Sequence, residues 1–223
     1  YLHQIIKQMK KNLLFITAIS VSVALASCAG GGETASEETT AAPEEAAAPT
    51  AETITWNVDP ATSNIRWEGG TAGAQVYSHF GNIAIQEGVV MTEAGNLANG
   101  EFVIDMTTIN PKDENYSEEH PASDLVGHLA SDDFFSVETY PTAAFVVKSA
   151  EGNVITGDLT IKGKTNEETI NVESVNISED GMTAAGTLVF DRQKYDVAWA
   201  HYLEDVVLSD DITLNITLSA KKG

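Results

Sequence analysis

Apolar and polar residues alternate along most of the chain after residue 53. The clearest run is residues 212–218, where isoleucine and leucine alternate with threonine and asparagine, and residues 155–161 repeat the pattern. Shorter runs of the same kind are Ile65/Trp67, Ile83/Ile85, Phe102/Ile104/Met106, Phe145/Val147, Ile170/Val172 and Ala184/Gly186/Leu188/Phe190. Because successive side chains of a strand point to opposite faces, this period predicts strands with one buried face.

Residues that favour tight turns separate these runs. They are Asp59-Pro60, Glu87-Gly88, Ala94-Gly95-Asn96, Glu151-Gly152-Asn153, Lys162-Gly163-Lys164 and Glu179-Asp180-Gly181. About eight to ten short strands joined by such turns predict an all-β fold, either an antiparallel barrel or a sandwich. A parallel α/β sheet is disfavoured, because no helix-length pattern separates the strands.

The alternation is interrupted over residues 111–140. Ser123 could cap a short helix that ends near Leu129, and residues 131–133 (Ser-Asp-Asp) offer a second helix cap before Phe134 and Phe135. The first helix would bury Leu125, Val126 and Leu129. A loop and short helix of this length within a sheet protein often cover an opening as a lid or plug. A structural cork that closes the bottom of the barrel is the alternative.

The N-terminal residues have the features of an export signal. Two lysines follow Met9, which we take as the start, and residues 13–25 are apolar but too few to span a bilayer. Residues 25–28 (Leu-Ala-Ser-Cys) resemble the lipobox of bacterial lipoproteins, and Cys28 is the single cysteine of the chain. We therefore expect a signal peptide over residues 1–27 and lipidation of Cys28. An ordinary secretory signal with an incidental cysteine is the alternative.

The next segment, residues 28–52, is predicted to be a disordered acidic tether. It contains six glutamates and no aromatic or large aliphatic residue. Such a composition cannot bury enough apolar surface to offset the entropy lost on ordering. The expected organisation is a signal peptide (1–27), an acylated cysteine with its tether (28–52) and one β-barrel domain (53–223).

The charge of the chain narrows the choice of partners. The formal net charge is −21, and the part after residue 27 carries 9 basic and 33 acidic residues, or −24. A nucleic-acid partner is disfavoured, because binding phosphates requires a basic face. A single cysteine also excludes a disulfide framework and a cysteine-rich metal site.

Several segments resemble the YceI-like family of secreted bacterial proteins. The most specific is residues 125–145, LVGHLASDDFFSVETYPTAAF, and it is supported by residues 56–67, 100–106, 155–165 and 190–199. The resemblance covers residues 53–220. Two stretches, residues 70–77 and 202–211, depart from the family pattern, so the mouth of the barrel is the part that the resemblance describes least well.

The resemblance implies a lipocalin-like antiparallel barrel of about eight strands whose cavity binds a polyisoprenoid chain, such as a polyprenyl lipid or a quinone tail. A barrel of this size has room for one slender ligand, and small residues at Gly157, Ala184 and Gly186 would leave space inside. The residues expected to line the cavity are Trp67, Phe102, Phe134, Phe135, Phe145, Leu159 and Phe190. Ordinary core packing is the alternative for each of them.

Catalysis has little support in the sequence. The domain histidines are His79, His120, His128 and His201, and their spacing matches no zinc motif. Neighbouring acids such as Asp132 and Asp133 are expected by chance in so acidic a chain. We therefore predict no catalytic residue, no metal and no required cofactor. An enzyme that uses His128 or an acid pair as a base is a remaining alternative.

The leading hypothesis is a lipid-anchored carrier or buffer of isoprenoid lipids in the cell envelope. Ala29 follows the lipidated cysteine, and the absence of aspartate there favours the outer membrane, with the periplasmic or surface side left open. A non-catalytic interaction or stress-protective lipoprotein with a packed barrel is the alternative. The family resemblance also allows a homodimer.

Overall fold

The computed structural model describes residues 52–72, 77–200 and 207–223. The predicted signal peptide, Cys28 and all but the last residue of the predicted tether lie outside the described residues. In chain order the elements are β1 (Thr53–Val58), β2 (Asn64–Ala72), β3 (Ser78–Glu93), β4 (Asn96–Pro111), α2 (Ala122–Ala130), β5 (Thr142–Glu151), β6 (Val154–Ile161), β7 (Lys164–Ile177), β8 (Gly181–Asp191), the 3-10 helix η1 (Arg192–Tyr195), β9 (Val207–Leu208) and β10 (Asp211–Lys222).

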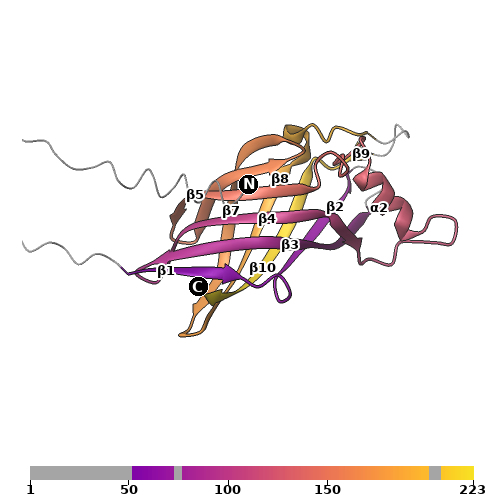
Figure 1. The fold of residues 1–223 in the computed structure, drawn as a ribbon. Coiled ribbons are helices and arrows are strands. Elements are labelled where there is room, and N and C mark those ends of the chain that lie inside the picture. The colour runs from indigo at the N-terminus through magenta and orange to yellow at the C-terminus, as the bar shows by residue number, and fades with distance from the viewer. Residues whose placement is uncertain (1–51, 73–76, 201–206) are drawn as a thin grey trace, which may run out of the picture. The chain divides into compact units, whose positions relative to one another are not determined.

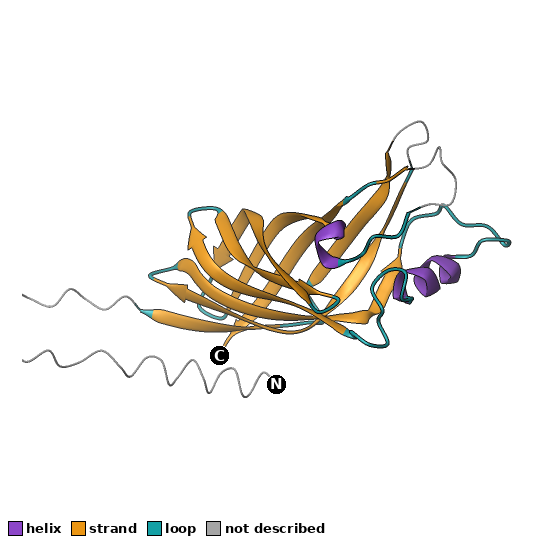
Figure 2. Cartoon of the chain, turned by 90° about the horizontal axis from the view of Figure 1, so that it is seen from above, coloured by secondary structure: helices purple, strands orange, loops and turns teal. Residues whose placement is uncertain are grey.

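Eight antiparallel strands close into a barrel (Figures 1 and 2). The strands β2 to β8 pair in sequence order, β8 pairs with β10, and β10 pairs back with β2 through partners such as Leu214 and Trp67. Strand β1 pairs with both β3 and β10, and the short β9 pairs with the last residues of β2. Each of these eight strands contains one of the alternating runs. The predicted all-β antiparallel barrel is therefore confirmed.

The tight turns follow the residues that favour them, with one exception. Ala94-Gly95 and Lys162-Gly163 both have positive φ at two successive residues, which is the conformation that short hairpin loops require. The predicted turn at Glu87-Gly88 is wrong, because both residues lie inside β3. The pairing of β3 with β4 shifts register between Ile85 and Glu87. A β-bulge at this point explains why Glu87-Gly88 resembles a turn in the sequence, since a bulge interrupts the alternation without ending the strand.

The helix in the insertion differs in detail from the prediction. Helix α2 begins after Pro121, without a side-chain cap, so the predicted cap at Ser123 is wrong. The second predicted helix is also wrong: residues 131–140 form turns, and the Ser131 hydroxyl donates to the His128 carbonyl oxygen (2.7 Å), closing the end of α2. None of the α2 residues is fully buried. The predicted burial of Leu125, Val126 and Leu129 is therefore wrong, because Leu125 and Leu129 line an open cavity rather than pack into a filled core.

The two ends of the barrel have different surroundings (Figure 1). We call the end at α2 and η1 the α2 end, and the end at β1 the β1 end. At the β1 end, Trp56 is 1% exposed, and its Nε1 donates to the Thr92 hydroxyl oxygen at 2.9 Å. Met182 and Ala220 are also almost completely buried there. Figure 2 shows the helices gathered at the other end of the strands.

Candidate ligand-binding cavity

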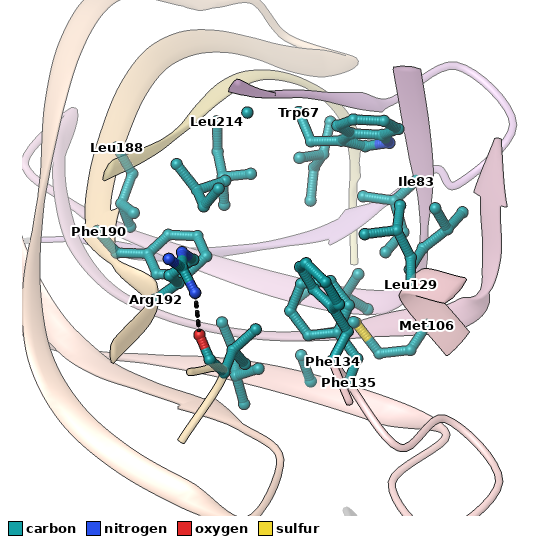
Figure 3. Close-up of a pocket in the computed structure, with 18 of the residues that line it drawn as sticks. Trp67, Ile83, Met106, Leu129, Phe134, Phe135, Leu188, Phe190, Arg192 and Leu214 are labelled. Atoms are coloured by element: carbon teal, nitrogen blue, oxygen red, sulfur yellow. Dashed lines mark hydrogen bonds between the residues drawn. The ribbon is translucent and has the colours of Figure 1, made fainter. Parts of the chain in front are cut away.

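A cavity of about 430 Å³ lies inside the barrel at the α2 end (Figure 3). Residues of all eight barrel strands, of α2 and of η1 line it. Most of them are aliphatic or aromatic, and this volume lies within the range of small-molecule sites in proteins. The barrel is therefore not packed solid at this end, and helix α2 forms part of the cavity wall.

All seven residues that the sequence proposed for the cavity lie on its wall. Phe102, Phe145 and Leu159 are direct neighbours across β4, β5 and β6, so they form one continuous apolar surface. Phe134 and Phe135 come from the turns after α2, with ring centroids 6.0 Å apart. Figure 3 shows these two rings near Met106, and Phe190 beside Arg192. Trp67 completes the set from β2.

The prediction that Gly157, Ala184 and Gly186 leave space for a ligand is wrong for the large cavity, because none of the three residues lines it. A Cβ on Gly157 would lie 2.5 Å from Phe145 Cζ and 2.6 Å from the Val146 carbonyl oxygen. The space at Gly157 is therefore already filled by the ring of the neighbouring strand. Ala184 and Gly186 line a separate cavity of only about 50 Å³. Phe102 and Phe145 line both cavities, so their rings lie between them.

A few polar side chains interrupt the apolar wall. Apart from tyrosine and tryptophan, these are His79, Asp124, His128, Arg192 and Ser209. Four apolar wall residues come from the alternating run of residues 212–218. The sequence reasoning did not propose them for the cavity, although the alternation already indicated that they face inward. The sequence reasoning also missed Arg192, whose place on the wall depends on how η1 packs.

Arg192 is buried and committed to structural contacts. Its side chain donates to the carbonyl oxygens of Ser209 (2.9 Å), Val197 (2.6 Å) and Trp199 (3.0 Å), and to the carboxylate of Asp210 (3.0 Å). Burial lowers the pKa of Arg192, and the negative charges of Asp210 and Asp191 oppose this effect. These contacts tie η1 to the chain segment before β10 and leave the guanidinium group little capacity for a further partner.

A cluster of three polar side chains, His79, Asp113 and Tyr116, lies where β3 begins. The Nδ1 of His79 is 3.1 Å from an oxygen of Asp113, and the Tyr116 hydroxyl donates to the other oxygen at 2.8 Å. Burial by itself raises the pKa of Asp113, but hydrogen bonds from Tyr116, His79 and two backbone N–H groups outweigh it and lower the pKa. Burial, together with the hydrogen bond to Asp113, raises the pKa of Tyr116. This cluster holds the loop after β4 against β3.

His128 occupies a different environment on α2. Its ring packs edge-on against Phe134 (4.9 Å between centroids) and Trp199 (4.7 Å). Its Nε2 is buried and has no hydrogen-bond partner among the described residues. A buried nitrogen without a partner carries a desolvation cost. His128 is therefore the wall residue whose polar atom the described part of the chain leaves unsatisfied.

Among residues 52–72, 77–200 and 207–223, no three His, Cys, Asp or Glu side chains gather as metal ligands would. Within the same ranges, none of the helices has the length and apolar character needed to cross a bilayer.

Part of the chain is similar in sequence to curated bacterial proteins. A UPF0312 protein of Staphylococcus aureus (strain USA300) is 40% identical over 93 residues, which cover 38% of this chain and 54% of that protein. The chain thus spans about half the length of the curated relatives it matches. The UPF0312 protein of strain NCTC 8325 matches equally well.

Two solved structures share the fold. BcnA of Burkholderia cenocepacia superposes with a TM-score of 0.54 at 24% identity, over 73% of this chain and 99% of that chain. A polyisoprenoid binding domain from Saccharophagus degradans superposes with a TM-score of 0.51 at 14% identity, over 76% and 99% of the two chains. The YceI-like domain model matches residues 56–220, nearly the whole barrel. The resemblance seen in the sequence is thereby confirmed: the chain belongs to the YceI-like domain family.

Proposed function

We propose that the barrel binds an isoprenoid lipid, with its tail in the cavity at the α2 end. The observation that carries the proposal is a cavity of about 430 Å³ with a wall of Ile, Leu, Phe and Trp. An apolar tail gains roughly 0.8 kcal/mol for each CH₂ group that it buries. The polyisoprenoid binding domain from Saccharophagus degradans has the same fold, which adds support for this class of ligand.

The tail supplies most of the binding energy in this proposal. Aromatic rings from β2, β4, β5 and β8 surround the space on several sides, and Phe134 and Phe135 contribute from the turns after α2. A branched, unsaturated chain complements such a surface through many weak contacts. We infer a binding protein that carries or buffers the lipid, with no catalytic step of its own.

Filling the cavity tests the proposal. Leu214 lies on the cavity wall in β10, whereas Val189, in the neighbouring β8, is 47% exposed. Leu214→Trp should leave the barrel folded and lower the affinity for an isoprenoid at least tenfold, because the larger ring takes the ligand's place. Val189→Trp adds the same ring outside the barrel and should bind like the wild type.

Mass spectrometry of organic extracts gives the readout from protein purified out of its own envelope. An isoprenoid should accompany the wild type and Val189→Trp, and be lost from Leu214→Trp. If the wild type carries no isoprenoid and takes up none when it is offered, the proposed function is wrong.

We further propose that the domain is held in the envelope through lipid on Cys28, with residues 28–52 as a flexible leash to the outer membrane. The lipobox-like residues 25–28 and the absence of any other cysteine support this anchoring. Expression from Met9 with Cys28→Ser should release the protein from the membrane fraction. Retention of Cys28→Ser in the membrane fraction would contradict the anchor.

A further inference from the structure

The polar atoms of the cavity wall differ in how they are used. Arg192 makes four hydrogen bonds with protein groups, and His79 lies in the cluster with Asp113 and Tyr116. His128 differs from both: its side chain lines the cavity, and its Nε2 is buried and has no hydrogen-bond partner among the described residues. A headgroup that enters the cavity could therefore satisfy this nitrogen.

The surroundings of His128 hold its ring in place. Phe134 and Trp199 both contact the ring edge-on, and the His128 carbonyl oxygen accepts hydrogen bonds from the Ser131 backbone N–H (3.2 Å) and from the Ser131 hydroxyl (2.7 Å). The helix end and two aromatic rings thus hold the imidazole ring in place. A hydrogen-bonding group held this way costs little ordering entropy when a ligand arrives.

The charges around this point favour an uncharged headgroup. Asp124, one turn before His128 on α2, also lines the cavity, and its carboxylate disfavours a phosphate nearby. Arg192 is the cation on the wall, and Asp210 together with three backbone carbonyl groups already engages it. A neutral hydroxyl or carbonyl oxygen needs no counter-charge, and either nitrogen of an imidazole ring can donate or accept, depending on the tautomer.

We propose that His128 Nε2 recognises the headgroup of the bound lipid, and that this headgroup is an uncharged hydroxyl or carbonyl rather than a diphosphate. This inference rests on the proposed function, since it assigns the polar end of the same ligand. The tail supplies affinity, and His128 supplies the preference among lipids that have equal tails.

The test compares three probes with one tail: geranylgeraniol, geranylgeranyl diphosphate and the matching hydrocarbon without a headgroup. Each competes against one fluorescent isoprenoid probe on the delipidated protein. A single neutral hydrogen bond contributes about 1 kcal/mol, so the wild type should bind the alcohol roughly fivefold more tightly than the hydrocarbon. The diphosphate should bind more weakly than the alcohol.

Substitutions separate headgroup recognition from packing. His128→Leu should abolish the ratio of alcohol to hydrocarbon affinity that the wild type shows, whereas His128→Gln, which keeps a hydrogen-bonding group, should retain part of that ratio. Leu129→Ala, at the next position of α2 and also on the cavity wall, is the matched control. It should weaken binding of the alcohol and the hydrocarbon by the same factor.

A stability measurement distinguishes recognition from a structural role. His128→Leu removes a buried, unpartnered nitrogen as well as two ring contacts, so these effects should offset each other and leave the unfolding midpoint of the ligand-free protein close to that of the wild type. The inference is overturned if His128→Leu binds both neutral probes with an unchanged ratio, or if the wild type prefers the diphosphate. If the wild type binds none of the probes, the proposed function fails and this inference fails with it.

Discussion

Toward the β1 end of the barrel, Val90 and Met182 line a cavity of only about 50 Å³, whereas side chains at the α2 end surround a cavity of about 430 Å³. Both ends use the same strands and the same kinds of apolar residue. The difference is in the fit: Trp56 is 1% exposed at the β1 end, while Trp67 forms part of the cavity wall. One end is closely packed, and the other keeps open space inside the barrel.

The polar groups differ in the same way. At the β1 end, the Trp56 N–H has a partner in Thr92. At the α2 end, Arg192 and Asp113 each make several hydrogen bonds, but His128 Nε2 has no partner in the described part of the chain. A buried polar atom without a partner carries a desolvation cost, and such atoms are few in native proteins. The two ends therefore differ both in packing and in how their polar atoms find partners.

The largest expected effect comes from removing a tryptophan at each end. Trp56→Ala should lower the free energy of unfolding by about 3–5 kcal/mol, because it opens a void in closely packed surroundings. Trp67→Ala should cost clearly less, since this side chain already faces a cavity. Urea unfolding of both variants measures the difference. Equal losses would show that the two ends are packed equally well.

Two glycine substitutions should have opposite signs. Gly157→Ala should destabilise the barrel by about 1–3 kcal/mol, because the new Cβ would overlap the Phe145 ring and the Val146 carbonyl oxygen. Gly127→Ala, in α2, meets no atom within 4 Å and should stabilise the helix by up to about 1 kcal/mol. Thermal unfolding of the two variants checks the signs. Destabilisation by Gly127→Ala would indicate that α2 has less room than its surroundings suggest.

The smallest expected effect is the pH dependence from Asp113. Its pKa is lowered in the folded state, so its charged form stabilises the fold at pH values above the ordinary aspartate pKa of about 4. This contribution is lost as the pH falls through the lowered pKa. Asp113→Asn should therefore weaken the fall in unfolding midpoint at acidic pH. Asp180→Asn, on an exposed turn, is the control and should follow the wild type.

Local sequence predicted much of the fold. The period of two identified all eight barrel strands, because alternation depends only on the geometry of one strand. Turn residues located most hairpins for a similar reason. The error at Glu87-Gly88 shows the limit, since a bulge and a turn share residue preferences and only the pairing with β4 separates them.

The candidate site was predictable only in part. Large aromatic residues at inward positions indicated where a wall could form, and all seven candidates lie on it. The prediction of free space beside the glycines was wrong, because a ring from the next strand can fill that space, as Phe145 does at Gly157.

The sequence by itself determined the strands, their inward faces, the family and a lipobox-like N-terminus. The tertiary structure decided which inward faces touch and which leave a cavity, and which polar atoms find partners. His79 and Asp113 are 34 residues apart in the chain, and Arg192 reaches Asp210 across 18 residues. The face on which a side chain lies is a local property of one strand, whereas free volume and hydrogen-bond partners depend on residues that only the closed barrel brings together.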